Sequence, residues 1–310
     1  MKQVTNTVLM IEPTNFGNNP RGEEVNEFQQ DITGLTPDQV HDLALLEFRN
    51  AVAQLEELGV EVVVFKDEVD SETPGSIFPN NWFSTHRSGQ LVTYPLAPEG
   101  RREERRSDIV AFLEEQCGFW EHLALEMFEQ QDDPRFLEGT GSMVLDRQNK
   151  VAYAAISPRT EEEPLFQFCE IMEYTPVTFR ATGPKGDPLL HTNMIMNMGD
   201  GFAIVALDAI HEEDVEKVRN SLLNSGKEII QITKQQAFYT FAGNMLQVEN
   251  KAEEKILILS RTAYYSLTED QLTRLTDHND HILPLPIHII EKVGGGSVRC
   301  MMAEIFKPDR

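Results

Sequence analysis

The chain has 310 residues, of which 40% are hydrophobic, so it is long enough to bury a large core. Its formal net charge of −24 argues against nucleic acid or an anionic membrane as partner, because phosphate groups repel an acidic surface. No apolar run reaches the roughly 18 residues of a membrane helix, and three cysteines without metal-ligand spacing favour a reducing, cytoplasmic compartment.

The predicted helices and strands recur in a fixed order along the chain. Strands are predicted where short apolar runs lie between turn residues, and helices where apolar residues recur with a period of 3.6. In chain order, the predicted elements are a strand at Val4–Ile11, a helix from Thr36-Pro37 to about Leu58, a strand at Val60–Phe65, a hairpin of Ile77–Phe83 and Gln90–Tyr94, a helix at Arg101–Gln116, a hairpin of Ser142–Leu145 and Lys150–Ile156, a helix at Glu161–Met172, a strand at Pro176–Phe179, a hairpin of Thr192–Met196 and Gly201–Leu207, a helix at Glu212–Leu223, a strand at Glu228–Ile232, a hairpin of Gly243–Val248 and Lys255–Leu259, a helix at Leu267–Asp277, a strand at His281–Leu285 and a final strand within Ser297–Ile305.

This order predicts an α/β fold of five strand–strand–helix–strand units. Four units span Ile77 to Leu285, and the fifth forms only if Ser297–Ile305 pairs with Val4–Ile11. Five such units that close on themselves give a pseudo-fivefold α/β propeller, with residues 1–310 as a single domain. An ordinary mixed α/β domain with incidental hairpins is the alternative from element order alone.

Polar residues recur at the opening strand of successive units. They are Asn81, Glu138, His191, Asn244 and Cys300, and neighbours in this series stand 53 to 57 residues apart. Equivalent positions of a propeller face one common axis, so a carboxylate, an imidazole and a thiol can meet there. Core packing does not explain different polar residues at nearly equal spacing.

Cys300 is the candidate nucleophile. It follows Gly294-Gly295-Gly296, and glycines let the backbone approach a ligand closely. A thiolate is the reactive form of cysteine, and a nearby protonated histidine favours it. A buried, inert cysteine is the alternative interpretation; it fits Cys169, on an apolar helix face, and Cys117, at a helix end, better than Cys300.

His191, Glu138 and Arg159 are the other candidates for chemistry. A lone histidine before an apolar strand is more often structural, unless it is paired with a cysteine. Glu138 precedes Gly139-Thr140-Gly141 and could simply cap a turn. Arg159 could be a solvated residue at a helix start, or its guanidinium could bind a substrate carboxylate.

These residues lie in motifs that resemble the guanidino/ureido-group-modifying superfamily of arginine deiminases, dimethylarginine hydrolases and amidinotransferases. The resemblance covers nearly the whole chain, and within the superfamily it is nearest to the citrulline-utilisation hydrolases. The matching segments, in the superfamily's order, are IFPNN with Asn81, LEGTG with Glu138, ISPRT with Arg159, HTNMIM with His191 and Asn193, and GGGSVRCM with Cys300.

The resemblance implies the five-unit propeller, or pentein fold, without a metal or other cofactor. It implies a hydrolase in which Cys300 attacks the central carbon of a ureido or guanidino amino acid. His191 would transfer protons, Glu138 would bind substrate N–H groups, and Arg159 would hold the carboxylate. Asn81 and Asn193 would line the substrate site.

Asn81 and Asn193 stand where superfamily members that bind a guanidinium usually have aspartate, which favours citrulline over arginine. Hydrolysis of citrulline would yield ornithine, carbon dioxide and ammonia. Three alternatives stay open: an amidinotransferase, an arginine or methylarginine deiminase, and an amino-acid-binding protein without turnover. Self-association into a homo-oligomer is also open.

Overall fold

The fold consists of five three-stranded sheets that share one topology. In the computed structural model, which describes residues 2–14, 16–17, 28–30, 32–67, 73 and 75–308, the first strand of each sheet is antiparallel to the second, and the second is parallel to the third. The sheets are β3 (Phe83–Thr85), β4 (Gln90–Thr93) and β5 (Glu121–Ala124); β6 (Met143–Asp146), β7 (Val151–Ala155) and β8 (Thr175–Phe179); β9 (Met196–Met198), β10 (Phe202–Val205) and β11 (Glu228–Gln231); β12 (Leu246–Glu249), β13 (Lys255–Ser260) and β14 (His281–Leu285); and β15 (Ala303–Glu304), β1 (Thr7–Glu12) and β2 (Glu61–Lys66).

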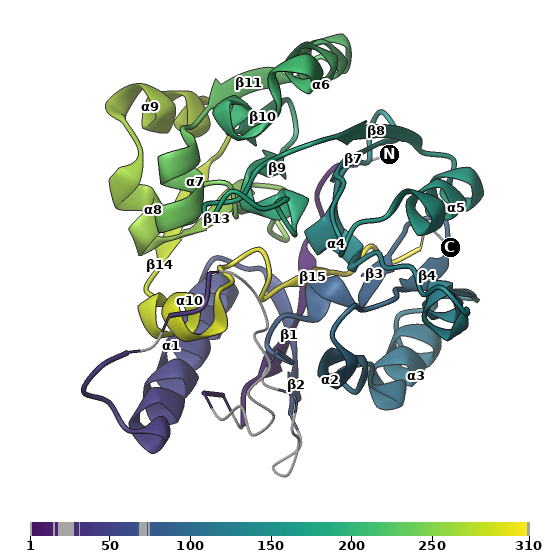
Figure 1. Ribbon diagram of the computed structural model, residues 1–310. Helices are drawn as coiled ribbons and strands as arrows, with labels where there is room; N and C mark the ends of the chain where they lie inside the picture. Colours follow the sequence, from purple (N-terminus) through teal and green to yellow (C-terminus); the bar gives the residue numbers. More distant parts are fainter. Residues whose placement is uncertain are drawn as a thin grey trace.

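Helices make the parallel crossover from the second to the third strand of every sheet, as parallel pairing requires. The helices are α1 (Pro37–Glu57), α2 (Glu99–Arg102), α3 (Ser107–Glu115), α4 (Gly139–Ser142), α5 (Glu162–Met172), α6 (Glu212–Asn224), α7 (Lys234–Thr240), α8 (Arg261–Ser266), α9 (Glu269–Asp277) and α10 (His288–Gly294). Figure 1 shows the crossover helices α1, α3, α5, α6 and α9 around the outside and α4 and β15 near the centre. The predicted five-unit ring is confirmed.

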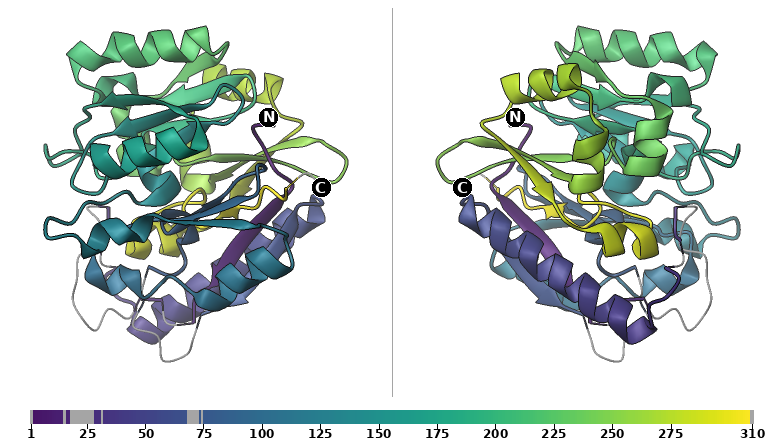
Figure 2. Two further views of the ribbon diagram at one scale, coloured as in Figure 1. Left: turned by 90° about the vertical axis from the view of Figure 1, so that its right-hand side faces the viewer. Right: turned by 90° about the vertical axis from the view of Figure 1, so that its left-hand side faces the viewer.

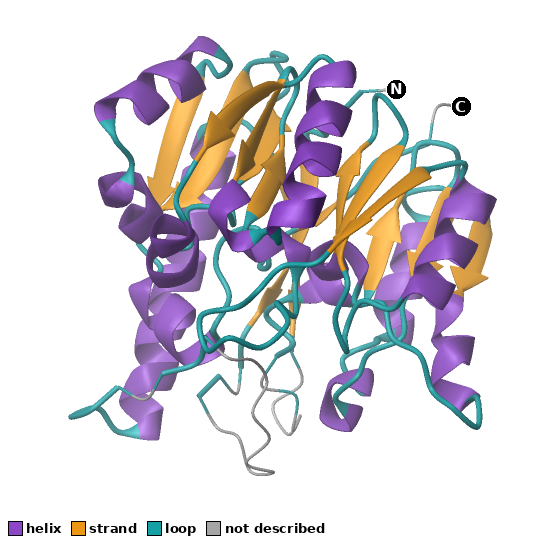
Figure 3. Ribbon diagram, turned by 45° about the horizontal axis from the view of Figure 1, so that its top comes forward, coloured by secondary structure: helices purple, strands orange, loops and turns teal. Residues whose placement is uncertain are grey.

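The ring closes through the two ends of the chain. Val8 of β1 pairs with Glu304 of β15, and Leu9 pairs with Ala303, so the fifth sheet joins residues that are almost the whole chain apart. Both chain ends therefore lie on the same side of the molecule, as Figures 2 and 3 show. Within the described residues, no helix combines the length and the apolar composition needed to cross a membrane.

Helix α1 illustrates how the sequence specifies the outer layer. Thr36 accepts a hydrogen bond from the backbone N–H of Gln39, whose side chain accepts one from Thr36 N–H, and this capping box starts the helix. Its apolar residues recur at helical spacing and pack on the fifth sheet; those that are buried are Val40, Ala44, Phe48, Ala51 and Leu55.

The first unit differs most from its prediction. The predicted strand at Ile77–Phe83 is a 3₁₀ turn, η1 (Pro79–Asn81), followed by the short strand β3. The predicted helix at Arg101–Gln116 is interrupted between α2 and α3, and Arg101, within α2, is buried. Strand β5 was not predicted, because its Glu121–Ala124 sequence is polar and mostly exposed.

Candidate active site

The polar residues that recur through the sequence lie on short turns just before the first strand of each unit. Asn81 ends η1, Glu138 precedes α4 and His191 precedes the short helix η3 (Thr192–Met194). Asn244 and Cys300 lie in the turns before β12 and β15. All five residues are buried, each with at most 9% of its surface exposed. The turns, rather than the strands themselves, carry these residues to the centre of the ring.

Two glycines let the Glu138 turn pack against the Asn81 turn. Gly139 has φ of +49°, and a Cβ there would lie 2.5 Å from the Asn80 carbonyl oxygen. A Cβ on Gly141 would lie 2.3 Å from Asn81 Nδ2. Asn81 Nδ2 can therefore donate a hydrogen bond to the Glu138 carbonyl at 3.4 Å. The LEGTG motif owes its glycines to this close approach.

The Glu138 carboxylate makes contacts with several charged or polar groups of the site. Its Oε2 lies 2.6 Å from His191 Nε2, 3.6 Å from Arg159 Nη1 and 3.9 Å from Arg101 Nη1. Its Oε1 accepts the backbone N–H of Ala97 at 3.1 Å. Burial alone would raise the pKa of Glu138, but Arg159, His191 and Arg101 outweigh it and lower the pKa to about 2. Glu138 is therefore ionised at neutral pH.

His191 is held as a neutral imidazole whose tautomer is set by Glu138. Burial lowers the pKa of His191, and the hydrogen bond and charge of Glu138 only partly offset this effect. An ionised carboxylate can only accept, so Nε2 carries the proton that it donates to Glu138. The other ring nitrogen, Nδ1, is then the basic atom, as a proton-transfer residue needs.

Two asparagine amides surround the Cys300 sulfur. Asn244 Nδ2 lies 3.3 Å from Cys300 Sγ and Asn193 Nδ2 lies 3.6 Å from it. Burial raises the pKa of the Cys300 thiol, whereas the two amides and the Arg299 guanidinium act in the opposite direction. The resting residue is thus a thiol, with N–H donors already placed to stabilise the thiolate when it forms.

The predicted residues form two connected groups. Asn81, Glu138 and His191 are linked by hydrogen bonds and Arg159 by an ion pair, while Asn193 contacts Cys300. The segment from His191 to Asn193 joins the groups, because it contributes one residue to each. Asn244, which the repeat pointed out but which was not predicted as a site residue, is the closest polar neighbour of the sulfur.

Arg101 is a site residue that the sequence analysis missed. Its guanidinium forms a bidentate pair with the buried Glu104, at 2.9 and 2.8 Å, and interacts electrostatically with both Glu138 and Cys300. Glycine at position 75 makes room, since a Cβ there would lie 2.4 Å from the Glu104 carboxylate. In sequence, Arg101 belongs to the charged run RREERR, which is typical of a solvated helix.

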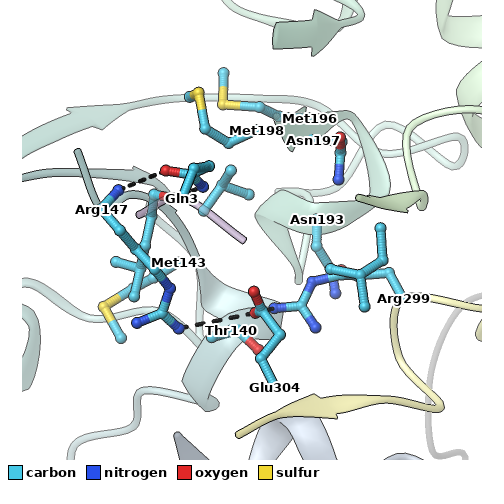
Figure 4. Close-up of a pocket in the computed structure, with 13 residues that line it drawn as sticks. Gln3, Thr140, Met143, Arg147, Asn193, Met196, Asn197, Met198, Arg299 and Glu304 are labelled. Carbon is cyan, nitrogen blue, oxygen red and sulfur yellow. Dashed lines mark hydrogen bonds and ion pairs between the residues drawn. The ribbon is translucent and has the colours of Figure 1, made fainter. Parts of the chain in front are cut away.

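A small cavity of about 30 Å³ is lined by Asn193 together with Arg147, Arg299 and Glu304 (Figure 4). Arg147 and Arg299 point toward Glu304 from opposite sides: Arg299 Nη2 lies 2.9 Å and Arg147 Nη2 lies 3.8 Å from its carboxylate. Two cations share one carboxylate, and one of them, Arg299, is the residue directly before Cys300. In the described part of the chain, no three His, Cys, Asp or Glu side chains form a group suited to a metal ion.

The ring of five mixed sheets is the pentein fold, which solved structures of low sequence identity share. More narrowly, the model of the family described as N,N-dimethylarginine dimethylhydrolase, eukaryotic, matches residues 12–307, and the chain belongs to that family. The predicted superfamily is therefore confirmed, and the coarse activity is hydrolysis of a C–N bond in a guanidino-type amino acid. Among curated protein sequences, none matches this chain.

Several solved structures share the fold at low sequence identity. The N-terminal domain of ArgZ, as a variant covalently bound to a reaction intermediate, is 16% identical, with a TM-score of 0.75 over 97% of this chain and 98% of that one. AgrE with ornithine and NAD⁺ is 18% identical, with a TM-score of 0.74 over 98% of this chain and 40% of that one. A dimethylarginine dimethylaminohydrolase variant, as its adduct with S-methyl-L-thiocitrulline, is 15% identical, with a TM-score of 0.67 over 97% and 99%.

Proposed function

We propose that the chain is a cysteine hydrolase that cleaves the C–N bond of a ureido or guanidino amino acid, with citrulline as the preferred substrate. The observation that supports this most directly is the buried Glu138–His191 pair at 2.6 Å, which the segment from His191 to Asn193 connects to a thiol that receives two amide N–H groups. A protein that only binds an amino acid needs neither a thiol with two amide N–H donors nor a histidine with a fixed tautomer.

In the proposed reaction, the Cys300 proton passes to His191, and the thiolate attacks the ureido carbon of citrulline. The C–N bond to the ornithine nitrogen breaks, and His191 returns the proton to the departing amine. Water then attacks the carbamoyl group on Cys300, with His191 as general base. The C–S bond breaks, and the carbamate released decays to carbon dioxide and ammonia.

The amino-acid end of the substrate would lie toward Arg159 and Arg101. Arg159 Nη1 is buried and lacks a hydrogen-bond partner among the described residues, so it is available for an incoming carboxylate. Arg101 approaches the same oxygen of Glu138 as Arg159 does, so it would add a second positive charge. A guanidinium is well suited to this role, because its planar fork matches a carboxylate.

The groups around the sulfur favour a neutral ureido group over a guanidinium. A guanidinium offers only donors and carries a charge, so its burial is costly without carboxylate partners. Glu138 already binds His191 and a backbone N–H and faces two arginines. Asn193 keeps one buried oxygen unpartnered among the described residues, and this oxygen could accept a ureido N–H.

A methylarginine is the second candidate substrate, and the family match favours it. In that reaction the methylamine would leave first, and water would then hydrolyse the intermediate on Cys300. Citrulline would be a product of this reaction and not its substrate.

A substrate panel separates the candidates, since each yields a different pair of products. The purified protein would be incubated with citrulline, arginine, agmatine, dimethylarginine and succinylarginine, and ammonia, methylamines, ornithine and citrulline would be measured. Ornithine and ammonia from citrulline, with kcat/KM at least about tenfold above that for the guanidino substrates, are expected. Dimethylamine and citrulline from dimethylarginine would establish the second candidate. An added amine acceptor that captures the intermediate would indicate a transferase, and the absence of turnover would refute the proposal.

A further inference from the structure

Helix α10, just before the glycine-rich turn that carries Cys300, contains a buried carboxyl group with no role in the chemistry above. Glu291 is 1% exposed, and no arginine or lysine among the described residues forms an ion pair with it. Its hydrogen-bond partner is a hydroxyl group: Ser297 Oγ donates to Glu291 Oε1 at 2.6 Å, and the nearby hydroxyl groups of Ser260 and Thr262 also act to lower the pKa of Glu291. A carboxyl group buried without a cation costs stability, so an apolar residue would suit this position better if packing were its only role.

Ser297 connects Glu291 to the nucleophile turn. The Ser297 carbonyl oxygen accepts the backbone N–H of Cys300 at 3.0 Å and that of Met301 at 3.3 Å, and these two bonds close the turn. Ser297 itself is completely buried. Fixing its hydroxyl group therefore fixes the peptide whose carbonyl orients the Cys300 backbone.

The residues directly before Ser297 are glycines, so they cannot anchor the turn through side chains. Gly295 has φ of +66°, a conformation that favours glycine, and a Cβ on Gly296 would lie 2.9 Å from the Phe78 ring and 3.3 Å from Cys300 Cβ. The glycines let the start of the turn fit against Phe78, but they offer no side chain that could anchor it there. The Glu291–Ser297 hydrogen bond anchors this end of the turn, while Arg299 anchors the other end through Met302 and Glu304.

The opposite end of helix α10 provides an internal comparison. Glu47 of α1 accepts the backbone N–H groups of Ile289 and Ile290, each at 3.0 Å, and so caps the first turn. Burial raises the pKa of Glu47, as it does that of Glu291. Both buried carboxyl groups thus contact the same helix, but Glu47 caps its first turn, and only Glu291 is bonded to the turn that carries the thiol.

We infer that Glu291 is a positioning residue for Cys300: its carboxyl group fixes Ser297, and Ser297 sets the turn that presents the thiol to the Asn193 and Asn244 amides. This inference rests on the proposed role of Cys300 as nucleophile. It predicts that loosening the Glu291–Ser297 contact slows every reaction of the thiol while leaving substrate binding at the arginines nearly unchanged.

The test compares four variants of the full-length protein: Glu291→Leu, Glu291→Gln, Ser297→Ala and, as the control, Glu47→Gln. For each, the second-order rate of Cys300 alkylation by iodoacetamide is measured by peptide mass spectrometry, together with kcat, KM and Tm. Glu291→Leu and Ser297→Ala should each lower the alkylation rate and kcat by at least about tenfold, since small displacements of a reacting group have effects of that size. KM should change less than about threefold.

Glu291→Gln keeps a hydrogen-bonding group of the same shape, so it should recover most of the rate that Glu291→Leu loses. Glu47→Gln should lower Tm but leave the alkylation rate within about twofold of wild type. The double variant Glu291→Leu/Ser297→Ala should be no slower than either single variant, because both changes break one contact.

The inference is overturned if folded Ser297→Ala, the smallest change in the set, alkylates at the wild-type rate, or if Glu47→Gln slows alkylation as much as Glu291→Leu. Alkylation needs no substrate. If the wild type turns over no compound in the panel while alkylation follows the expected pattern, the positioning role is supported and the proposed hydrolase activity fails separately.

Discussion

Replacement of Arg159 by glutamine should separate the binding of the substrate carboxylate from the chemistry at the thiol. A bidentate guanidinium–carboxylate contact contains two charge-assisted hydrogen bonds, each worth about 1.5–3 kcal/mol, so its loss predicts a fall in kcat/KM for citrulline of at least about a hundredfold. Arg159 also lies 3.6 Å from Glu138, where two charges attract by about 4–5 kcal/mol at an effective dielectric constant of 20. Removing it should therefore also raise the pKa of Glu138 and lower kcat.

The two effects can be measured apart with 4-ureidobutylamine, the analogue of citrulline without its carboxylate. In Arg159→Gln, kcat/KM for citrulline should fall because KM rises and kcat falls. For the analogue, kcat/KM should fall only by the smaller change in kcat. Arg180→Gln is the matched control, because Arg180 pairs with Glu213 and Asp214 on an exposed surface. Equal losses of kcat/KM for citrulline and the analogue would refute the carboxylate-binding role and make Arg159 a structural partner of Glu138.

Four further outcomes are expected. Cys300→Ser should keep its Tm and lose at least about a thousandfold in turnover, because a hydroxyl group ionises far less readily than a thiol; more than a few per cent of wild-type activity would contradict a covalent mechanism. Turnover should survive exhaustive treatment with EDTA, and activity that returned only with a divalent metal would overturn this expectation. Asn81→Asp combined with Asn193→Asp should weaken citrulline turnover and tighten arginine binding, and a wild-type preference for arginine would end that reasoning. The pKa of Glu291 rises on folding from its ordinary value of 4.5 to about 7, because burial outweighs the effect of the nearby hydroxyl groups. The protonated form therefore stabilises the fold at low pH, and up to about 3 kcal/mol is lost as pH rises from 4.5 through 7. The free energy of unfolding of Glu291→Gln, measured with urea at several pH values, should not fall in this way.

The ring and most of its units could be predicted because each hairpin has its own turn residues and each outer helix its own apolar stripe. Strand β5 could not, since Glu121–Ala124 pairs with β4 along an edge that leaves its side chains exposed and polar. Its place in the sheet depends on a parallel partner and not on a local pattern.

The residues of the candidate site differ in the same way: local sequence patterns predict the burial of some of them, while that of others depends on distant partners. The burial of Glu138, His191 and Cys300 on equivalent turns could be predicted, because the fivefold repeat gives them equivalent positions. Arg101 could not, because its burial depends on Glu104 and on a carboxylate from the next unit, and neither dependence is visible in a run of charged residues. Whether a guanidinium is buried depends on residues far away in the sequence that the folded ring brings next to it.

The pairing of β15 with β1 has a consequence for the order in which the protein matures. The segment with Cys300 follows the other four units along the chain, and its strand is only two residues long and needs β1 as its partner. During synthesis, Glu138, His191 and Asn193 emerge from the ribosome before the thiol exists, and domains fold as their residues become available. On the proposed mechanism, a nascent chain gains its nucleophile only after translation reaches this segment. The thiol is then placed in the ring when β15 pairs with β1.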